Sequence, residues 1–387
     1  ADAPFNRPSA DTILRTADHV DFHVHRIILI QASPFFADMF SLPQPQNVVQ
    51  DAPVIDVSED SKTLRHLLQI CYPTDRPVLE SLDDLVPVLR AAMKYSMDWL
   101  AKTLSKSFIA AIPQFPFQVW AHACRSDLPE VARQAIAEIK GRSTETITAT
   151  GVLDSLLQDA GLGALEGISS GTYYRLRECL RDGDQSTFTV EPLPNPLPAQ
   201  EVFSCITEPP PDVAFKCSDD VVIHAHKVIV ALHIPDLLPP QGTQSLPCGT
   251  ADESEPLQTI PIYGTSMRSA TLSDLLRACY GGAPAIPADT VAVARMLLEC
   301  QKSHITTHLA TLVKKQWDDL ASSSPLAAYF AAVQQGLPPE IIQAAARNTL
   351  DIALPRGYTP CMEDVPASAY HFLLQFHSAA TEAASGQ

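Results

Sequence analysis

Glycine and charged residues are scarce in this sequence, and it has neither membrane-length apolar runs nor closely paired cysteines. Charged residues make up 18% of the chain, and 15 glycines stand against 33 prolines, so proline-rich connections are expected between packed segments. The nine cysteines are scattered without a C-x-x-C pair, which favours reduced thiols in a cytoplasmic or nuclear protein. No run approaches the roughly 18 to 20 apolar residues of a membrane helix, so no membrane partner is expected.

Basic residues are also few. The chain carries 27 Lys and Arg against 44 Asp and Glu, a formal net charge of −17. An acidic surface repels phosphate backbones and anionic lipid, so nucleic acid is not expected as a partner. A length of 387 residues suggests two or three domains with cores of their own.

The first 72 residues contain patterns that recur in the second half of the chain. Residues 11–15, 22–26 and Pro34 return 201 positions later as 212–216, 223–227 and Pro235. Pro53 and residues 63–72 return 208 positions later as Pro261 and 271–280, so the second copy has seven extra residues between 238 and 261. Such self-similarity predicts that one structural unit is built twice.

The repeat continues into the remainder of each half. Residues 116–120 match 325–329 at an offset of 209, which aligns Trp120 with Tyr329, and both aromatic side chains are expected in helical cores. Residues 168–176 match 365–373 at an offset of 197, which aligns Tyr173 with Tyr370. Between the copies, residues 182–209 are rich in proline and read as an extended, semi-rigid linker.

Periodicity within the first copy predicts an α+β domain. Residues 12–16 and 21–25 alternate like a β-hairpin with Phe22 and Val24 inward, and 53–57 is a third strand. Ser33-Pro34 before an apolar stripe predicts a helix start. Helices are expected over 26–31, 34–40, 63–72, 82–93 and 97–111, with buried positions that include Leu67, Leu68, Val88, Leu89 and Leu104. The rest, from about 113 to 181, is predicted to be helical.

Several separated motifs occur in the order of a known family. They are Ala10–Leu14, Phe22-His-Val-His-Arg26, the run from Ser33 to Phe40, and Leu67-Leu68 with Cys71-Tyr-Pro73. These residues closely resemble a BTB/POZ domain, particularly the fungal BTB proteins that carry a following helical segment. The second copy keeps Asp212, His226, Lys227, Pro235 and Cys279-Tyr280, but has Ile-Pro-Asp-Leu in place of Ser-Pro-Phe-Phe.

The resemblance implies two tandem BTB/POZ-like domains, each a small sheet flanked by helices and followed by an α-helical, BACK-like extension. We expect a first BTB/POZ domain at 9–112, its extension at 113–181, the proline-rich linker at 182–209, a second, divergent BTB/POZ domain at 210–320 and its extension at 321–380.

Two motifs raise the alternative of an enzyme. His23-x-His25 and His224-x-His226 place paired imidazoles on one strand face, as metal ligands can be, but no third ligand recurs in both copies. We therefore expect the second histidine of each pair to satisfy a backbone group. The run Gly167 to Gly171 is formally G-x-S-x-G around Ser169, yet helix-like sequence precedes it, so Ser170 or Thr172 is expected to cap a helix.

Opposite charges recur at equivalent places in both copies. Asp11 pairs in position with Arg26, and Asp212 with Lys227. The family resemblance implies that these residues lie in a charged groove beside the dimer contact, which makes them the candidate binding residues. The competing interpretation is an ordinary buried ion pair that orients the hairpin against the helix.

The leading functional prediction is a non-catalytic protein-interaction scaffold, without cofactor or metal, whose two BTB domains pair within one chain or as a homodimer. A narrower alternative is a substrate adaptor of a cullin-based ubiquitin ligase. Against it, Leu42-Pro43-Gln44 stands where such adaptors often carry a hydrophobic-x-Glu motif. A third possibility is transcriptional corepression through the charged groove, and a different class altogether is a hydrolase or metal-dependent enzyme.

Overall fold

The computed structural model describes residues 1–42, 48–49, 52–75, 77–79, 81–144, 146–182, 184–192, 203–204, 209–238, 260–281, 286–352, 354 and 357–385. The longer loop of the second copy and residues 193–202 and 205–208 of the predicted linker lie outside the described residues. The first part of that linker is not extended as predicted, because residues 185–187 form a 3₁₀ turn and Phe188 is buried. The chain forms two compact units. The first comprises Ala1–Ala164 and Cys179–Val190, and the second comprises Leu165–Glu178 and Glu191–Gln387.

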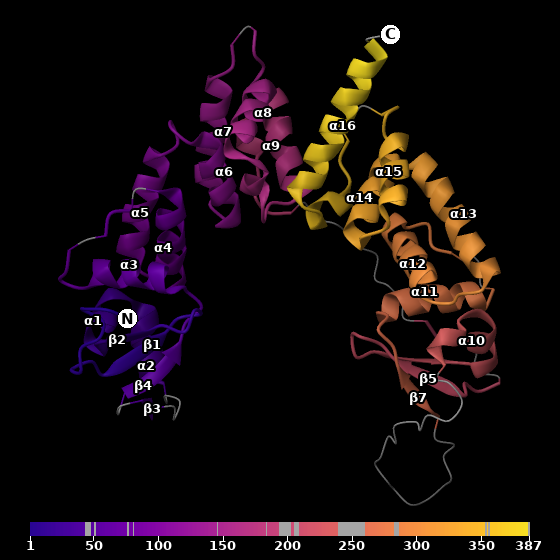
Figure 1. The fold of residues 1–387 in the computed structure, drawn as a ribbon, viewed down its shortest axis with the longest axis horizontal. Coiled ribbons are helices and arrows are strands. Elements are labelled where there is room, and N and C mark those ends of the chain that lie inside the picture. The colour runs from indigo at the N-terminus through magenta and orange to yellow at the C-terminus, as the bar shows by residue number, and fades with distance from the viewer. Residues whose placement is uncertain are drawn as a thin grey trace, which may run out of the picture. The chain divides into compact units, whose positions relative to one another are not determined.

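A small mixed sheet forms the start of the first unit (Figure 1). Its strands are β1 (Thr12–Arg15), β2 (Asp21–Val24), β3 (Val48–Val49) and β4 (Ala52–Asp56), in the order β2-β1-β4-β3. Strand β1 pairs antiparallel with β2 and parallel with β4, so it lies inside the sheet. Both Ile13 and Leu14 are fully buried, which shows that side chains on the two faces of β1 are covered. The predicted hairpin is confirmed, with Phe22 and Val24 buried.

Five helices complete this part of the unit, and they follow the predicted order. They are α1 (Arg26–Ala32), α2 (Pro34–Ser41), α3 (Ser61–Cys71), α4 (Leu82–Lys94) and α5 (Asp98–Ala110). Ser33 begins α2 as predicted, because its hydroxyl accepts a hydrogen bond from the amide of Phe36 and Pro34 is the first helical residue. Each predicted core position on α3, α4 and α5 is buried: Leu67, Leu68, Val88, Leu89 and Leu104.

The remaining helices of the region are α6 (Pro116–Arg125), α7 (Pro129–Gly141), α8 (Ala149–Ala160) and α9 (Ser170–Asp182), followed by a short 3₁₀ turn at Gln185–Thr187. Trp120 on α6 is fully buried, and its ring stacks on Phe117 with 5.6 Å between centroids. Its predicted place in a helical core is confirmed, as is that of Tyr329, which is 6% exposed in the second unit.

The second unit contains a three-stranded sheet of the same kind. Its strands are β5 (Val213–Lys216), β6 (Val222–Ala225) and β7 (Ile262–Gly264), in the order β6-β5-β7. Ala214 faces His224 across the hairpin, as Ile13 faces His23 in the first unit. Ala214 also pairs in parallel with Ile262, as Ile13 does with Val54. The strand registers of the two sheets thus follow the sequence offsets of 201 and 208.

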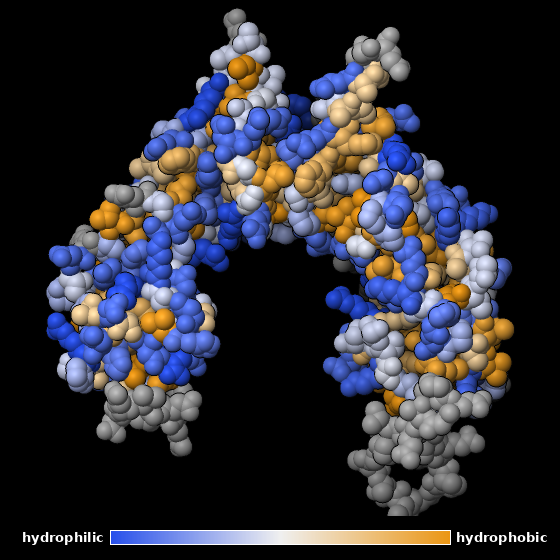
Figure 2. Space-filling model, in the orientation of Figure 1, coloured by the Kyte–Doolittle hydropathy of each residue, from blue (hydrophilic) through white to orange (hydrophobic). Residues whose placement is uncertain are grey.

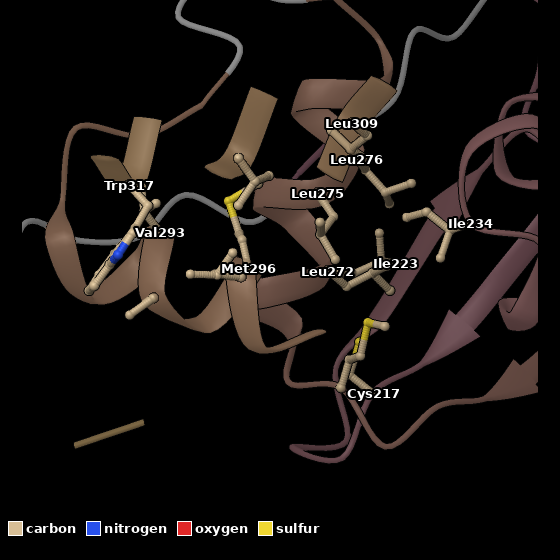
Figure 3. Close-up of a cluster of buried hydrophobic side chains, with 14 of the residues drawn as sticks. Cys217, Ile223, Ile234, Leu272, Leu275, Leu276, Val293, Met296, Leu309 and Trp317 are labelled. Atoms are coloured by element: carbon tan, nitrogen blue, oxygen red, sulfur yellow. The ribbon is translucent and has the colours of Figure 1, made fainter. Parts of the chain in front are cut away.

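Helices α10 (Lys227–His233), α11 (Ser269–Cys279), α12 (Thr290–Lys302) and α13 (Thr307–Ser323) share one hydrophobic core with this sheet. Figure 3 shows Leu272, Leu275 and Leu276 between the sheet and the side chains of Val293 and Met296. One element differs: the counterpart of α2 is a 3₁₀ turn at Pro235–Leu237, because Ile234 has no hydroxyl to cap a longer helix.

The second unit ends with α14 (Pro325–Gln335), α15 (Pro339–Asn348), a 3₁₀ turn at Pro360–Asp364 and α16 (Ala367–Ser385). Residues 165–178, which include the first part of α9, belong to this unit. They lie against the chain just before and within α16, because Ser169 forms an antiparallel bridge with Pro366.

Candidate interaction site

Asp11 begins the first candidate site, at the start of β1. Its amide donates to the carbonyl of Val24, and its Oδ1 accepts a hydrogen bond of 2.8 Å from the amide of Arg26. The residue that precedes α1, His25, makes no side-chain cap. The Asp11 carboxylate therefore takes the place of a helix cap from a strand 15 residues upstream, and it ties the hairpin to α1.

Asp212 makes the same contact in the second unit. Its Oδ1 accepts a bond of 2.6 Å from the amide of Lys227, the first residue of α10. Arg26 instead directs Nε to the Thr12 hydroxyl, at 2.7 Å, and lies over the ring of Phe40. Neither Asp11 with Arg26 nor Asp212 with Lys227 forms a side-chain ion pair in the part of the chain described. The interpretation as an ordinary buried ion pair is wrong, because each carboxylate binds an amide and both aspartates are exposed.

The second histidine of each His-x-His pair contacts a tyrosine. The amide of His25 donates to the Tyr72 hydroxyl at 2.7 Å, and the amide of His226 donates to the Tyr280 hydroxyl at 2.8 Å. Nε2 of His226 also lies 2.7 Å from the carbonyl oxygen of Pro209. Over the described ranges, no cluster of three His, Cys, Asp or Glu side chains could hold a metal ion. Both histidines instead anchor the end of the hairpin to the helix that ends near the tyrosine.

Apolar side chains lie exposed on the helices that these aspartates cap. Ile27 on α1 is 62% exposed, and its counterpart Val228 on α10 is 74% exposed. Ile27 lines a surface groove of about 390 Å³ together with Ile28, Ile70, Cys71 and Trp99. Sequence reasoning missed this groove, although residues 27–30 are all apolar. Four consecutive helical residues point to different sides of the helix, so packing on one face cannot bury all of them. Only Leu29 of the four is buried.

The mixed sheet, its capped first helix and the following helices are the part of the chain that matches a known family. The family model for the BTB/POZ domain matches residues 5–111. Residues 5–111 form a BTB/POZ domain. No curated protein matches the chain. A BTB domain is generally a module for protein–protein interaction, so the groove and the exposed face of α1 lie on a domain of the right class to bind another protein.

None of the helices among the described residues is long and apolar enough to cross a membrane.

The Asp11 carboxylate and Ile27 both lie at the first turn of α1 in the BTB domain, one at its amino end and the other on its exposed face. The domain therefore offers a polar edge beside an apolar surface.

Ser169, the serine of the G-x-S-x-G run, lies outside the BTB domain and acts as a helix cap. Its Oγ accepts a bond of 3.0 Å from the amide of Thr172 and donates to Glu363. The predicted cap at Ser170 or Thr172 is therefore wrong by one or more residues. A 3₁₀ turn at Leu162–Leu165 precedes Ser169, and Ser169 itself forms only an isolated bridge, so the strand that a nucleophile elbow needs is not formed there.

Glu363 is the centre of a buried polar cluster in the second unit. Its carboxylate pairs with the guanidinium of Arg175, and each side chain is only 8% exposed. The Tyr358 hydroxyl donates to Glu363 Oε1 at 2.9 Å, and burial, together with this contact, raises the pKa of Tyr358. A Cβ at Gly171 would overlap the carboxylate, so only glycine leaves room for it there. Sequence reasoning could not find this pair, because its members are 188 residues apart.

The strand bridge beside this cluster has local two-fold symmetry. The amide of Ser170 donates to the carbonyl of Val365, and the amide of Ala367 donates to the carbonyl of Ile168 at 2.8 Å. Each member of this exchange is the counterpart, 197 residues away, of a member of the other bond. The rings of Tyr173 and Tyr370, also counterparts, meet edge to face with centroids 6.1 Å apart. This is the geometry of an isologous contact, made within one chain.

Proposed function

We propose that this protein is a non-catalytic interaction scaffold, in the cytoplasm or nucleus, in which a second BTB-like module follows the BTB domain. The observation that supports the second module most is the pair of matched strand registers. The capping contacts add to it: Asp219 binds the first residue of α11, Ser269, as Asp18 binds Ser61 on α3. Such agreement in hydrogen bonds is more specific than a shared order of elements.

Pairing between the two modules is the proposed architecture of the scaffold. The exposed side chains of Ile27 and Val228 would both be covered by it, since each lies on the corresponding helix of its module. Within one chain the partner is present at an effective concentration of the order of millimolar, which favours pairing inside the chain over pairing between chains. The local two-fold contact around Ser169 and Pro366 supports the same arrangement.

Light scattering coupled to size exclusion tests this architecture. A mass near 42.0 kDa at low micromolar concentration is expected for pairing within the chain, and twice that mass would contradict it. Small-angle scattering should then show a larger radius of gyration for the double variant Ile27→Glu and Val228→Glu. Val78→Glu is the matched control, because Val78 is 73% exposed and does not line the groove. An unchanged radius in the double variant would overturn the pairing.

A cullin-adaptor role is the narrower candidate, supported by the BTB domain alone. Leu42 is 64% exposed at the end of α2, where an adaptor would present its contact surface, whereas Pro43 and Gln44 lie outside the described residues. A pull-down of purified cullin with the full chain, repeated with Leu42→Glu, decides it. No capture by the unaltered chain would leave the scaffold alone.

A further inference from the structure

The helix pair α6–α7 has an apolar surface that is covered by a residue from later in the chain. Phe188 is fully buried, and its ring centroid lies 6.4 Å from that of Trp120 on α6. Arg133 on α7 donates from Nη1 to the carbonyl oxygen of Phe188 at 3.0 Å. The segment after α9 therefore binds this helix pair through one aromatic side chain and one backbone hydrogen bond.

The pair α14–α15 in the second unit is constructed in the same way. Both α6 and α14 begin with proline, and the turn that leaves each helix closes with the same bond, from Leu128 to Ala123 and from Leu337 to Ala332. Tyr329 takes the position of Trp120. The two helix pairs can therefore be compared residue by residue.

The surface of α14–α15 that corresponds to the Phe188 site is open. It forms a groove of about 360 Å³, lined by Tyr329, Ile342, Gln343, Ala346, Arg347, Phe372, Leu373 and Phe376. Phe372 is 51% exposed and Phe376 37% exposed. The reason is the length of α16, which continues to Ser385, whereas α9 ends at Asp182 and the chain then delivers Phe188 (Figure 1). Figure 2 shows hydrophobic residues at the surface over these helices.

The lining also holds the polar groups that a peptide would need. Gln343 is the fifth residue of α15, as Arg133 is the fifth of α7, and its amide can donate to a peptide carbonyl in the same manner. Arg347 is exposed on the rim and forms no ion pair in the described ranges, so it attracts an acidic residue beside the aromatic one. The parts of this chain outside the described residues contain no Phe, Tyr or Trp. None of those parts can therefore supply an aromatic occupant.

We propose that the α14–α15–α16 groove binds an extended peptide segment of a partner protein that presents one aromatic side chain with an acidic residue a few positions away. The bound segment would occupy the groove as residues 184–191 occupy α6–α7. This site lies in the second unit, separate from the BTB domain at residues 5–111.

A labelled synthetic peptide with the sequence of residues 184–191, which contains Phe188 and acidic residues at both ends, is the probe. Fluorescence anisotropy against the full chain should give saturable binding with a dissociation constant below about 1 mM. The peptide with Ala in place of Phe188 should bind at least about tenfold more weakly. No saturable binding by the first peptide, or equal binding by both, would overturn the proposal.

Two chain variants locate the binding. Ala346→Leu fills the groove and should weaken binding about tenfold or more, whereas Ala344→Leu, exposed on the same helix outside the lining, should leave it unchanged. Arg347→Glu should weaken binding of the acidic probe without a change in fold, which circular dichroism checks. If the peptide instead displaced Phe188 from α6–α7, Ala346→Leu would not affect it, and that result would sink the proposal.

Discussion

Single carboxylates join distant elements in both units. Asp11 and Asp212, each one residue before a strand, bind the first amide of a helix 15 residues later in the chain, and Glu363 binds a guanidinium 188 residues away. The two aspartates satisfy helix amides that have no acceptor within the helix, and Glu363 neutralises a buried guanidinium.

Asp11→Ala should destabilise the BTB domain by about 0.5–2 kcal/mol, because the first amide of α1 loses its acceptor. Asp11→Asn should cost less, since an amide oxygen can accept the same bond. Urea unfolding measures both. Equal losses in the two variants would mean that the charge, and not the hydrogen bond, is what matters. Asn keeps the cap but not the charge. A partner that no longer binds the Asp11→Asn chain, although the chain stays folded, must therefore recognise the charge of Asp11.

Glu363→Gln should lower the free energy of unfolding by about 3–5 kcal/mol, because it leaves the buried guanidinium of Arg175 without its counter-ion. The control is Asp220→Asn, which breaks the exposed pair with Lys216 and should leave stability unchanged. Denaturant unfolding of the full chain measures both. A loss no larger for Glu363 than for the control would show that the pair contributes nothing.

Glu59 supplies a pH dependence within the BTB domain. Burial raises the pKa of its carboxyl, but hydrogen bonds from Lys94 and Tyr95 outweigh burial, so the pKa lies below its usual range. Its contribution to stability is therefore present at neutral pH and is lost as the pH falls through the pKa of the folded state. Urea unfolding measures the free energy of unfolding at about pH 7 and about pH 3.5. This free energy should fall less between the two pH values for Glu59→Gln than for the unaltered chain. Parallel losses would contradict this.

At the scale of elements, the helix pairs α6–α7 and α14–α15 are built alike but differ in whether their shared surface is covered. The first is closed by the segment that carries Phe188, and the second is left open beside Phe372 and Phe376. The length of one helix decides between the two cases.

Phe188→Ala should destabilise the first unit by about 3–5 kcal/mol, because it empties a fully buried aromatic site against Trp120. Phe376→Ala on the open pair should cost much less, because that ring is already partly in water. Thermal unfolding monitored by tryptophan fluorescence compares them. Equal shifts would mean that the two surfaces do not differ in the way described.

Most elements of the BTB domain could be predicted from the sequence, because their apolar periods and caps are local. The hairpin, the Ser33-Pro34 helix start and the core leucines of α3 needed no information beyond a dozen neighbours. The contacts of Asp11 could not be assigned correctly, since sequence gives the charge of Arg26 but not that its amide is the nearer donor. The Glu363 cluster and the open groove depend on residues far apart in the chain, so no local sequence pattern predicts them.

At the scale of the whole molecule, residues 165–178 are the decisive segment, because they precede the linker yet pack within the second unit. The bridge between Ser169 and Pro366 and the buried pair of Arg175 with Glu363 fix them there. The covalent linker is then not the only connection between the two halves of the sequence.

A chain cut at a protease site introduced between residues 193 and 202 should therefore remain together on size exclusion, with a mass near 42.0 kDa. Glu363→Lys in the cut chain should separate the pieces, because it places two cations in one buried site. The uncut Glu363→Lys chain controls for folding. Separation of the cut but otherwise unaltered chain would show that the contact is too weak to hold without the linker.

Evolutionary constraint should differ between the two helix pairs as a result of the filled and open grooves. Around Phe188, a substitution destabilises the fold, so few substitutions are tolerated on this surface. Around Phe376, a substitution changes how a partner peptide fits and leaves the fold intact. The second surface can thus acquire new specificity while the first keeps the protein intact.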